Sequence, residues 1–394
     1  MKPFYVISLL RGGVVGLYAP LWILFLYHSG YNLFLLGLIG TIFEIAKFVF
    51  EVPSGAIADK FGVKVNLSIS AICLSMTWLL FPFSSNWLIL MTLLLTWTLS
   101  ETLFSGTFEA WISSVVNEEQ FSKVLLNNSK LYILCIIIIA PISGYLYHIN
   151  KVIPFVLAGL ISMILIIFII KFIKIRSNPK AESESTPFSV LLIIKNATAV
   201  LFNNKRAFNI IIASFFFAFV IDTIDRYWQP YFQYIGIDES KFGFVAMTGG
   251  IVLLVMLHTF SQFNAKINQL PEAFNLLIVM LTIILIVLIA LGKKLVTFIS
   301  ISFVTVMDDL MNVLINNALN QEMSQKSSSM ATIFSLNGAS GAFGEILSGV
   351  IFGYVILKVG YTVTFIACSA LLIVPFICYL VNVRVISKEK HYTP

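Results

Sequence analysis

Long apolar runs separated by short polar segments occupy most of the chain. A helix needs roughly 20 mainly apolar residues to cross a lipid bilayer. Five runs without Asp, Glu, Lys or Arg are of about that length: 131–150, 152–170, 242–265, 273–292 and 359–383. With the remaining runs, the pattern predicts twelve helices, over 5–28, 32–58, 66–84, 87–114, 127–147, 152–173, 207–234, 239–264, 271–291, 295–321, 328–356 and 360–383.

One long polar segment, 174–206, interrupts this pattern between the sixth and seventh predicted helices. It divides the chain into an N-terminal six-helix bundle, residues 1–173, and a C-terminal six-helix bundle, residues 207–394. We expect the segment itself to be a cytoplasmic linker.

The two halves also repeat a short motif after their first helices. Gly30-Tyr-Asn is followed by Gly37, and Gly236-Ile-Asp is followed by Gly243 at the same spacing. Repeated six-helix halves are a known transporter architecture, in which the substrate binds near the membrane midplane between the halves.

Composition agrees with a membrane protein. The chain is 59% hydrophobic and 11% charged, whereas a soluble domain has about 25% charged residues. The net charge of +6 reflects topology rather than nucleic-acid binding. With both termini in the cytoplasm, seventeen Lys and Arg residues lie in cytoplasmic segments, and the five in external segments are Lys151, Lys241, Lys293, Lys294 and Lys358. This is the positive-inside asymmetry of a correctly phased set of helices.

Neither a cofactor nor a metal site is indicated. The four cysteines, Cys73, Cys135, Cys368 and Cys378, lie in apolar runs and lack C-x-x-C spacing. The sequence has no G-x-x-x-x-G-K-[ST] phosphate loop, so nothing indicates coupling to ATP.

A charged turn between the second and third predicted helices reads Gly55-Ala-Ile-Ala-Asp-Lys-Phe-Gly-Val-Lys64. This G-x-x-x-D-K-x-G-x-K pattern resembles the signature loop of the major facilitator superfamily, although Val63 replaces one of its usual basic residues. The resemblance implies a secondary transporter rather than an enzyme. It also implies an all-α membrane protein, with twelve transmembrane helices in two pseudo-symmetric six-helix bundles and a central cavity. The loop itself would act as a conformational latch, formed by Gly55, Asp59, Lys60, Gly62 and Lys64, with Glu109 as a possible further member.

Charged residues inside the predicted spans are candidates for function. Placing Arg, Lys or Asp at the centre of a membrane helix costs roughly 2.5–3.5 kcal/mol, so such a residue is either functional or part of a neutralised structural pair. On the second helix, Glu44, Lys47 and Glu51 are spaced i, i+3, i+7 and form one stripe. Both interpretations stay open for this stripe.

The seventh helix carries a second group. Asp222 and Arg226 are four residues apart and can pair, which leaves Asp225 as a spare acid. Trp228 and Pro230 nearby suggest an irregular helix that lines a cavity.

The tenth helix has one polar face. Asp309, Asn312, Asn316 and Asn320 recur at helical spacing. A polar face inside a membrane requires water or substrate, so we expect it to line a cavity.

These groups define the candidate site. A proton carrier must be a buried acid that can be neutral in one state and charged in another, which gives as proton-coupling candidates Asp225, Asp309, Asp222, Glu101 and Glu44. The substrate-cavity candidates are Arg11, Tyr18, Lys47, Arg226, Trp228, Asn312 and Asn316.

Two functions remain open at this point. The segments Glu51-x-Pro-x-Gly55 and Phe108-Glu-Ala-Trp111 together resemble bacterial efflux members of the superfamily. That resemblance favours proton-coupled export of a small amphipathic or cationic organic compound by a monomer in the bacterial cytoplasmic membrane, with lipid, substrate and protons as partners. The alternative is a dedicated exporter or importer of an anionic metabolite or metal-chelating compound, which Arg11 and Lys47 would contact.

Overall fold

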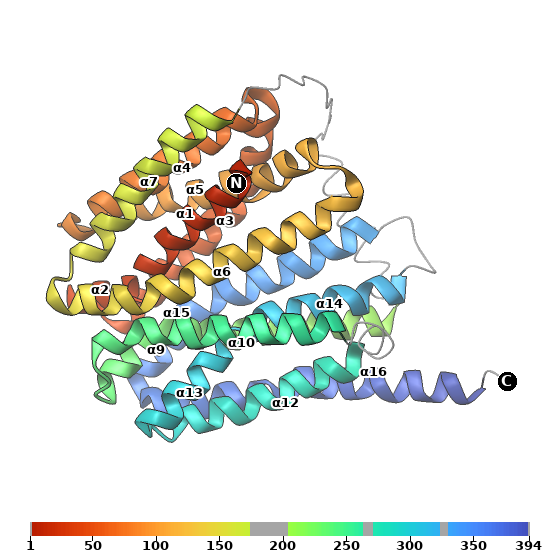
Figure 1. Ribbon diagram of the computed structural model, residues 1–394. Helices are drawn as coiled ribbons and strands as arrows, with labels where there is room; N and C mark the ends of the chain where they lie inside the picture. Colours follow the sequence, from red (N-terminus) through yellow and green to blue (C-terminus); the bar gives the residue numbers. More distant parts are fainter. Residues whose placement is uncertain (1, 174–203, 263–270, 324–329, 393–394) are drawn as a thin grey trace. The chain divides into compact units, whose positions relative to one another are not determined.

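Helices are the regular secondary structure of the computed structural model, which describes residues 2–173, 204–262, 271–323 and 330–392 (Figure 1). Side-chain surroundings are described for a smaller set, which leaves out 52–61, 118–119, 260–262, 321–323, 330–335 and 386–392. Most of the predicted linker, 174–203, therefore lies outside the described residues.

The helices follow the predicted runs closely. The N-terminal half contains α1 (Pro3–Tyr18), α2 (Trp22–His28), α3 (Leu33–Phe61), α4 (Val63–Leu80), η1 (Phe81–Phe83), α5 (Trp87–Val115), α6 (Glu118–Ile149) and α7 (Ile153–Phe172). The C-terminal half contains α9 (Lys205–Tyr234), η2 (Glu239–Lys241), α10 (Phe242–Gln262), α12 (Pro271–Ala290), α13 (Lys294–Val304), α14 (Met307–Met323), α15 (Met330–Leu371) and α16 (Ile373–Tyr392).

Eleven segments in the described part of the chain are long and apolar enough to cross a membrane. The last one, Leu336–Val385, has 50 residues, which suffices for two crossings of roughly 20 residues each. Gly360 divides it, because its φ of +81° belongs to the left-handed region and interrupts the helix. The twelve predicted crossings of an all-α membrane protein are thus accounted for.

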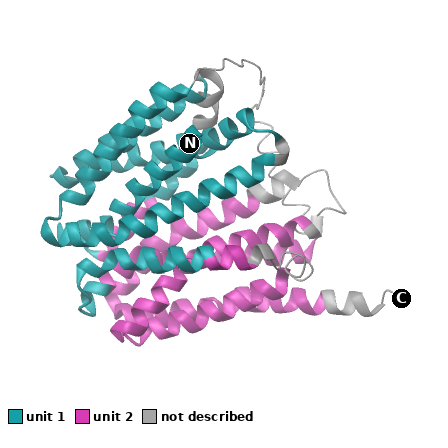
Figure 2. Ribbon diagram, in the orientation of Figure 1, with its two compact units in different colours: residues 1–32, 42–182, 232–254 teal, residues 33–41, 183–231, 255–394 magenta. Residues whose placement is uncertain are grey.

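Contacts group the chain into two compact units (Figure 2). Unit 1 comprises 1–32, 42–182 and 232–254, and unit 2 comprises 33–41, 183–231 and 255–394. Residues 33–41 of α3 thus pack with helices from the second half of the sequence, and the start of α10 packs with helices from the first half. The predicted boundaries at 173 and 207 divide the chain into two halves by sequence, whereas these units are defined by contacts. The boundaries stay a prediction.

The repeated glycines occupy equivalent positions in the two halves. Gly30 and Gly236 both have left-handed backbones, with φ of +93° and +74°. In unit 2, a Cβ on Gly37 would meet the carbonyl oxygen of Gly349 on α15. In unit 1, a Cβ on Gly243 would meet the carbonyl oxygen of Ala140 on α6. In each half, therefore, the second crossing needs its glycine for backbone contact with another helix.

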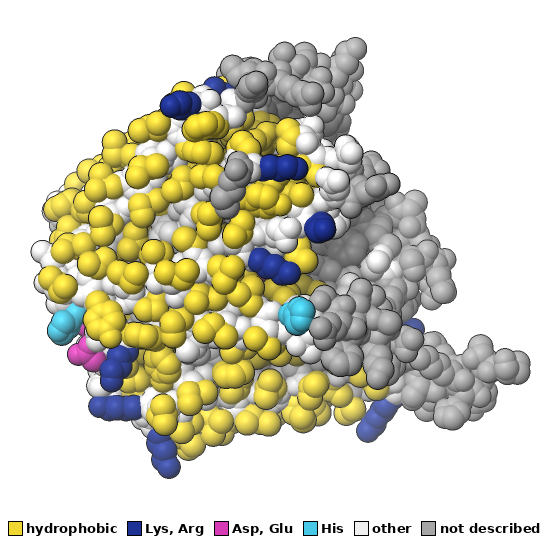
Figure 3. All heavy atoms as spheres, in the orientation of Figure 1, with side chains coloured by type: hydrophobic (Ala, Val, Ile, Leu, Met, Phe, Trp, Pro, Cys, Tyr) yellow, Lys and Arg dark blue, Asp and Glu magenta, His cyan; other side chains and the backbone are white. Residues whose placement is uncertain are grey.

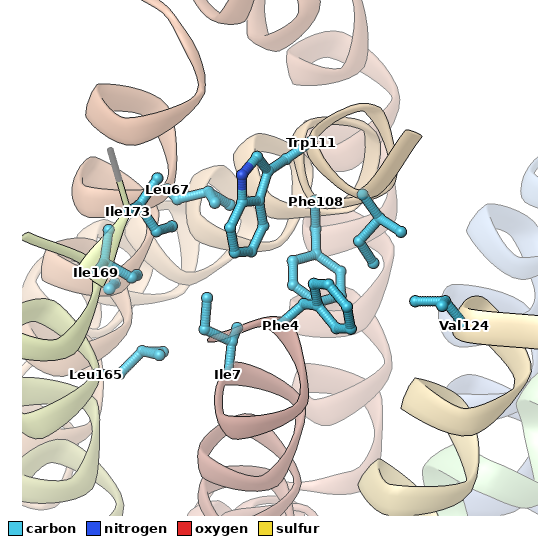
Figure 4. Packing of buried hydrophobic residues seen from close by; sticks show 11 residues of the cluster. Phe4, Ile7, Leu67, Phe108, Trp111, Val124, Leu165, Ile169 and Ile173 are labelled. Atoms are coloured by element: carbon cyan, nitrogen blue, oxygen red, sulfur yellow. The ribbon is translucent and has the colours of Figure 1, made fainter. Parts of the chain in front are cut away.

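The core of unit 1 holds the Phe-Glu-Ala-Trp segment of α5 in place. Phe108 and Trp111 point into a buried cluster with Phe4 and Ile7 of α1 (Figure 4). The rings of Phe4 and Trp111 meet edge to face, with centroids 6.2 Å apart. Two of the four residues of this segment, Phe108 and Trp111, are therefore packing residues.

The outer surface is apolar, as a bilayer requires. Large hydrophobic side chains such as Leu88, Ile149 and Leu295 are exposed, and hydrophobic side chains cover most of the described surface in Figure 3. A soluble protein rarely exposes so much contiguous apolar area, so lipid is the natural solvent of this face.

Candidate functional site

A buried ion pair joins two helices inside unit 1. Arg11 of α1 donates from Nη2 to Oε2 of Glu101 on α5 at 2.6 Å. The Arg11 side chain is only 6% exposed, and its guanidinium also lies 3.8 Å from the centroid of the Phe104 ring. A cation over an aromatic face is stabilised by the ring quadrupole. Arg11 is thus held by one carboxylate and one ring.

The pair is not saturated. Nη1 of Arg11 and Oε1 of Glu101 are both buried, and neither has a hydrogen-bond partner among the residues that the structure describes. Buried polar atoms without partners are uncommon, because each costs about 1–3 kcal/mol. The donor and the acceptor are therefore available to a ligand or to water.

Aromatic side chains surround the next turns of the same helices. Tyr18 stacks on Trp78 with ring centroids 3.8 Å apart. Trp97, one turn before Glu101 on α5, contacts Tyr18, Trp22 and Phe43 with centroids 5.4, 5.3 and 4.5 Å away. Unit 1 thus combines a charged pair with a cluster of aromatic rings.

Unit 2 contains a second buried ion pair, as the sequence predicted. Arg226 donates to the Asp222 carboxylate through Nε and Nη2, at 3.0 and 2.5 Å. The Ser348 hydroxyl on α15 also donates to Asp222. Asp222 is therefore bound by a cation from its own helix and by a hydroxyl from a neighbouring helix.

Residues near the start of α3, together with Tyr227 of α9, pack around this ion pair. A Cβ on Gly40 would fall on the Arg226 guanidinium, so only glycine leaves room for that side chain. Thr41 donates to the carbonyl oxygen of Ile346 at 2.7 Å. The Tyr227 hydroxyl donates to the carbonyl oxygen of Gly349 at 2.8 Å. The ion pair thus lies within a tight backbone contact.

Asp225 is the spare acid of the predicted group. Its Oδ1 is buried and has no hydrogen-bond partner within the described part of the chain. Four other carboxyl groups lie within electrostatic range of it, those of Asp222, Asp308, Asp309 and Glu345. Like charges repel strongly at low dielectric, so this cluster favours the binding of a proton or another cation.

The predicted polar face of the tenth crossing is present on α14. Asp309, Asn312, Asn316 and Asn320 are all exposed, whereas the opposite face of the helix is buried through residues such as Leu314. Asn312 donates to Asp308 at 2.8 Å. Exposed carboxylate and amide groups on a crossing helix are stable only beside water.

The stripe on α3 is less enclosed. Lys47 donates to Glu44 at 3.4 Å, with exposed side-chain fractions of 52% and 13%, and Glu51 is exposed. An exposed pair of this kind contributes about 0–1 kcal/mol.

The predicted latch is described only in part. Residues 52–61 are helical, but the side chains of Gly55, Asp59 and Lys60 lie outside the described residues. Gly62 has φ of +81° and precedes the first residue of α4. Lys64 is in the first turn of α4, and Glu109 is exposed on α5.

The expectation of an irregular helix near Pro230 is wrong. The helix α9 runs through Pro230 to Tyr234, and Trp228 is buried. The breaks lie instead at residues 19–21, between α1 and α2, and at residues 305–306, between α13 and α14. A proline near a helix end is tolerated where neighbouring helices support the freed carbonyl.

Sequence reasoning missed Gly40, Thr41 and Ser348. The only available signal was the spacing of small residues, since Gly37 and Thr41 on α3 lie four apart, as small residues at helix contacts often do. That spacing indicates close helix contact, but it does not name Arg226 as the group that fills the space.

Comparison with known proteins agrees with a membrane transporter. Residues 4–345 match the model of a family described as the Major Facilitator Superfamily. The chain is 35% identical over 382 residues to a Bacillus subtilis (strain 168) protein named as an uncharacterized MFS-type transporter, YxaM. The matched residues cover 97% of this chain and 95% of that relative.

Solved transporter structures share the fold. The nucleoside transporter NupG is similar with a TM-score of 0.77 at 13% identity, covering 96% of this chain and 98% of that chain. The peptide transporter POT gives 0.74 at 12%, covering 97% and 94%, and a D-xylose-proton symporter gives 0.71 at 12%, covering 96% of each. At such identities the likeness concerns the fold alone.

Proposed function

We propose that this chain, a membrane transporter that belongs to the major facilitator superfamily, exports a small amphipathic or cationic organic compound in exchange for protons. The transport is secondary and involves alternating access of the substrate site to the two sides of the membrane. The membrane is the bacterial cytoplasmic membrane, and both termini lie in the cytoplasm.

The surroundings of Asp225 carry the proposal. A buried carboxyl oxygen without a hydrogen-bond partner among the described residues lies near four other carboxyl groups, and the neighbouring cation, Arg226, is engaged by Asp222. A proton or a cationic substrate that binds there relieves the repulsion in either case. Competition between the two for one acidic cluster is the simplest way to exchange them.

The aromatic cluster of unit 1 supports an amphipathic substrate. Trp22 and Phe43 are both half-buried beside Trp97, and aromatic faces bind organic cations and flat apolar groups. The anionic alternative has less support, because Arg11 and Lys47 each already face a carboxylate. An anion that bound either cation would lie beside the carboxylate of Glu101 or Glu44, whose charge repels it.

Everted membrane vesicles that contain the full chain test this function. The probes are ethidium, tetraphenylphosphonium and rhodamine 6G as organic cations, and carboxyfluorescein as the anion. With the vesicle lumen acidified, we expect at least one cation to accumulate inside, and a protonophore to release it. Accumulation of carboxyfluorescein alone, or no gradient-driven accumulation of any cation above vesicles without the protein, contradicts the proposal.

A further inference from the structure

Two histidines and a glutamate from three separate elements meet at one end of unit 1. His28 ends α2, His148 lies in the last turn of α6, and Glu239 begins η2. Nδ1 of His28 is 3.9 Å from Oε2 of Glu239, and Nδ1 of His148 is 3.8 Å from Oε1 of the same carboxylate. Each oxygen of Glu239 thus faces one imidazole.

Two of these elements, α6 and η2, are in backbone contact close to this cluster, and α2 joins them through a side chain. A Cβ on Gly144 of α6 would lie 2.5 Å from the carbonyl oxygen of Ser240 in η2. His28 also shares a hydrogen bond with the hydroxyl of Tyr147, at 3.1 Å between Nδ1 and the oxygen. The cluster therefore lies next to a close backbone contact between α6 and η2.

Two lysines and one further carboxylate surround the cluster. Lys151 faces His28, and Asp238 and Lys241 lie close to one another beside His148. Hydrogen bonds from the Ser240 hydroxyl and backbone amide lower the pKa of the Asp238 carboxyl, so it stays ionised. His148 consequently faces two carboxylates, of which Asp238 keeps its charge.

We propose that His28, His148 and Glu239 form a proton-binding site, separate from the acids of unit 2, that fastens α2 and α6 to η2 when the external medium is acidic. Histidine is the side chain whose charge changes between about pH 5 and 8. Protonation converts a contact between an imidazole and a carboxylate into a charge-assisted pair. His148 is 59% exposed, whereas His28 is 20% exposed and faces Lys151.

The position of the site fits this role. In the predicted topology, the loops that follow α2, α6 and α9 all lie on the external side of the membrane. The pH varies most on that side. The effect is modest, since pairs with an exposed member contribute about 0.2–1 kcal/mol each. Such a pair changes the opening equilibrium of η2 by roughly 1.4- to fivefold.

Hydrogen exchange of the full chain in lipid nanodiscs tests the site without any substrate. The measured quantity is the protection factor of a peptide that covers 236–243, which corrects for the effect of pH on intrinsic exchange. We expect protection in the wild type to fall by roughly 1.4- to fivefold between pH 5.5 and 8.0. The change should disappear in the double variant His28→Gln/His148→Gln and in Glu239→Gln.

The matched control is His258→Gln, which removes an exposed histidine from α10 away from the cluster. It should keep the full pH dependence, and so should Lys241→Gln. A peptide from α4 serves as an internal reference for correct folding. The proposal is wrong if wild-type protection is the same at both pH values, or if the double histidine variant keeps the wild-type change.

Discussion

Replacing Gly40 by alanine places a methyl group where the Arg226 guanidinium lies. The guanidinium must then leave its position against Asp222, to which it donates at 2.5 and 3.0 Å. Its side chain is 6% exposed and that of Asp222 is 18% exposed, so the pair counts as buried. Breaking a buried pair costs about 3–5 kcal/mol. We expect the lower end, about 3 kcal/mol, because Asp222 keeps its bond from Ser348.

Thermal unfolding of the purified chain in detergent measures this cost. The matched control is Gly106→Ala on α5, since a Cβ on Gly106 meets nothing within 4 Å. Alanine at such a helical position is neutral or stabilises by about 0.5–1 kcal/mol. We therefore expect the Gly40 variant to unfold several degrees below the Gly106 variant.

A thermodynamic cycle separates the guanidinium from other effects. In the background Asp222→Asn/Arg226→Ala, the side chain that collides with the new methyl group is absent, so Gly40→Ala should cost less than about 1 kcal/mol. Equal costs in both backgrounds, or a Gly40 variant as stable as the Gly106 variant, would refute the reasoning.

Three further predictions concern topology, the latch and the first ion pair. Cysteine placed at Ser183 in the predicted linker should react only with membrane-permeant reagents, and labelling of intact cells by an impermeant maleimide contradicts a cytoplasmic linker. Asp59→Asn should slow transport yet leave equilibrium binding of the substrate nearly unchanged, so loss of binding with an intact fold moves the loop into the substrate site. Arg11→Gln alone should lower stability by about 3 kcal/mol, because Glu101 is left without its cation, and Arg11→Gln/Glu101→Gln should recover part of it; an unchanged unfolding temperature in the single variant argues against the pair.

The number and placement of the helices could be predicted because each crossing needs a long apolar run. The helix ends could not be placed from the sequence, since hydropathy marks only the part of a helix that lies in lipid. The helix α6 begins at Glu118, well before the predicted 127, because its first turns are polar. Nothing in the sequence marked the break at 305–306.

The pairing of Asp222 with Arg226 could be predicted because both lie on one helix, four residues apart. Partners on different helices could not. The contact of Arg11 with Glu101, and that of Gly40 with Arg226, depend on how helices distant in sequence are aligned. The composition of a span reveals a charged residue in the membrane, but only packing shows what neutralises it.

Separating energy coupling from substrate movement tests the proton-coupled exchange most directly. Proteoliposomes containing wild type, Asp225→Asn, Asp309→Asn or the exposed-loop control Asp238→Asn would be loaded with the cation that the vesicle screen identifies. Both pH-driven accumulation and substrate exchange at equal pH would be measured. We predict that Asp225→Asn or Asp309→Asn abolishes pH-driven accumulation but spares exchange, because the remaining acids of the cluster still bind the cation, while the control keeps both. Undiminished accumulation in both variants, and likewise after neutralising Asp222, Glu101 and Glu44, would contradict the account and make these acids structural.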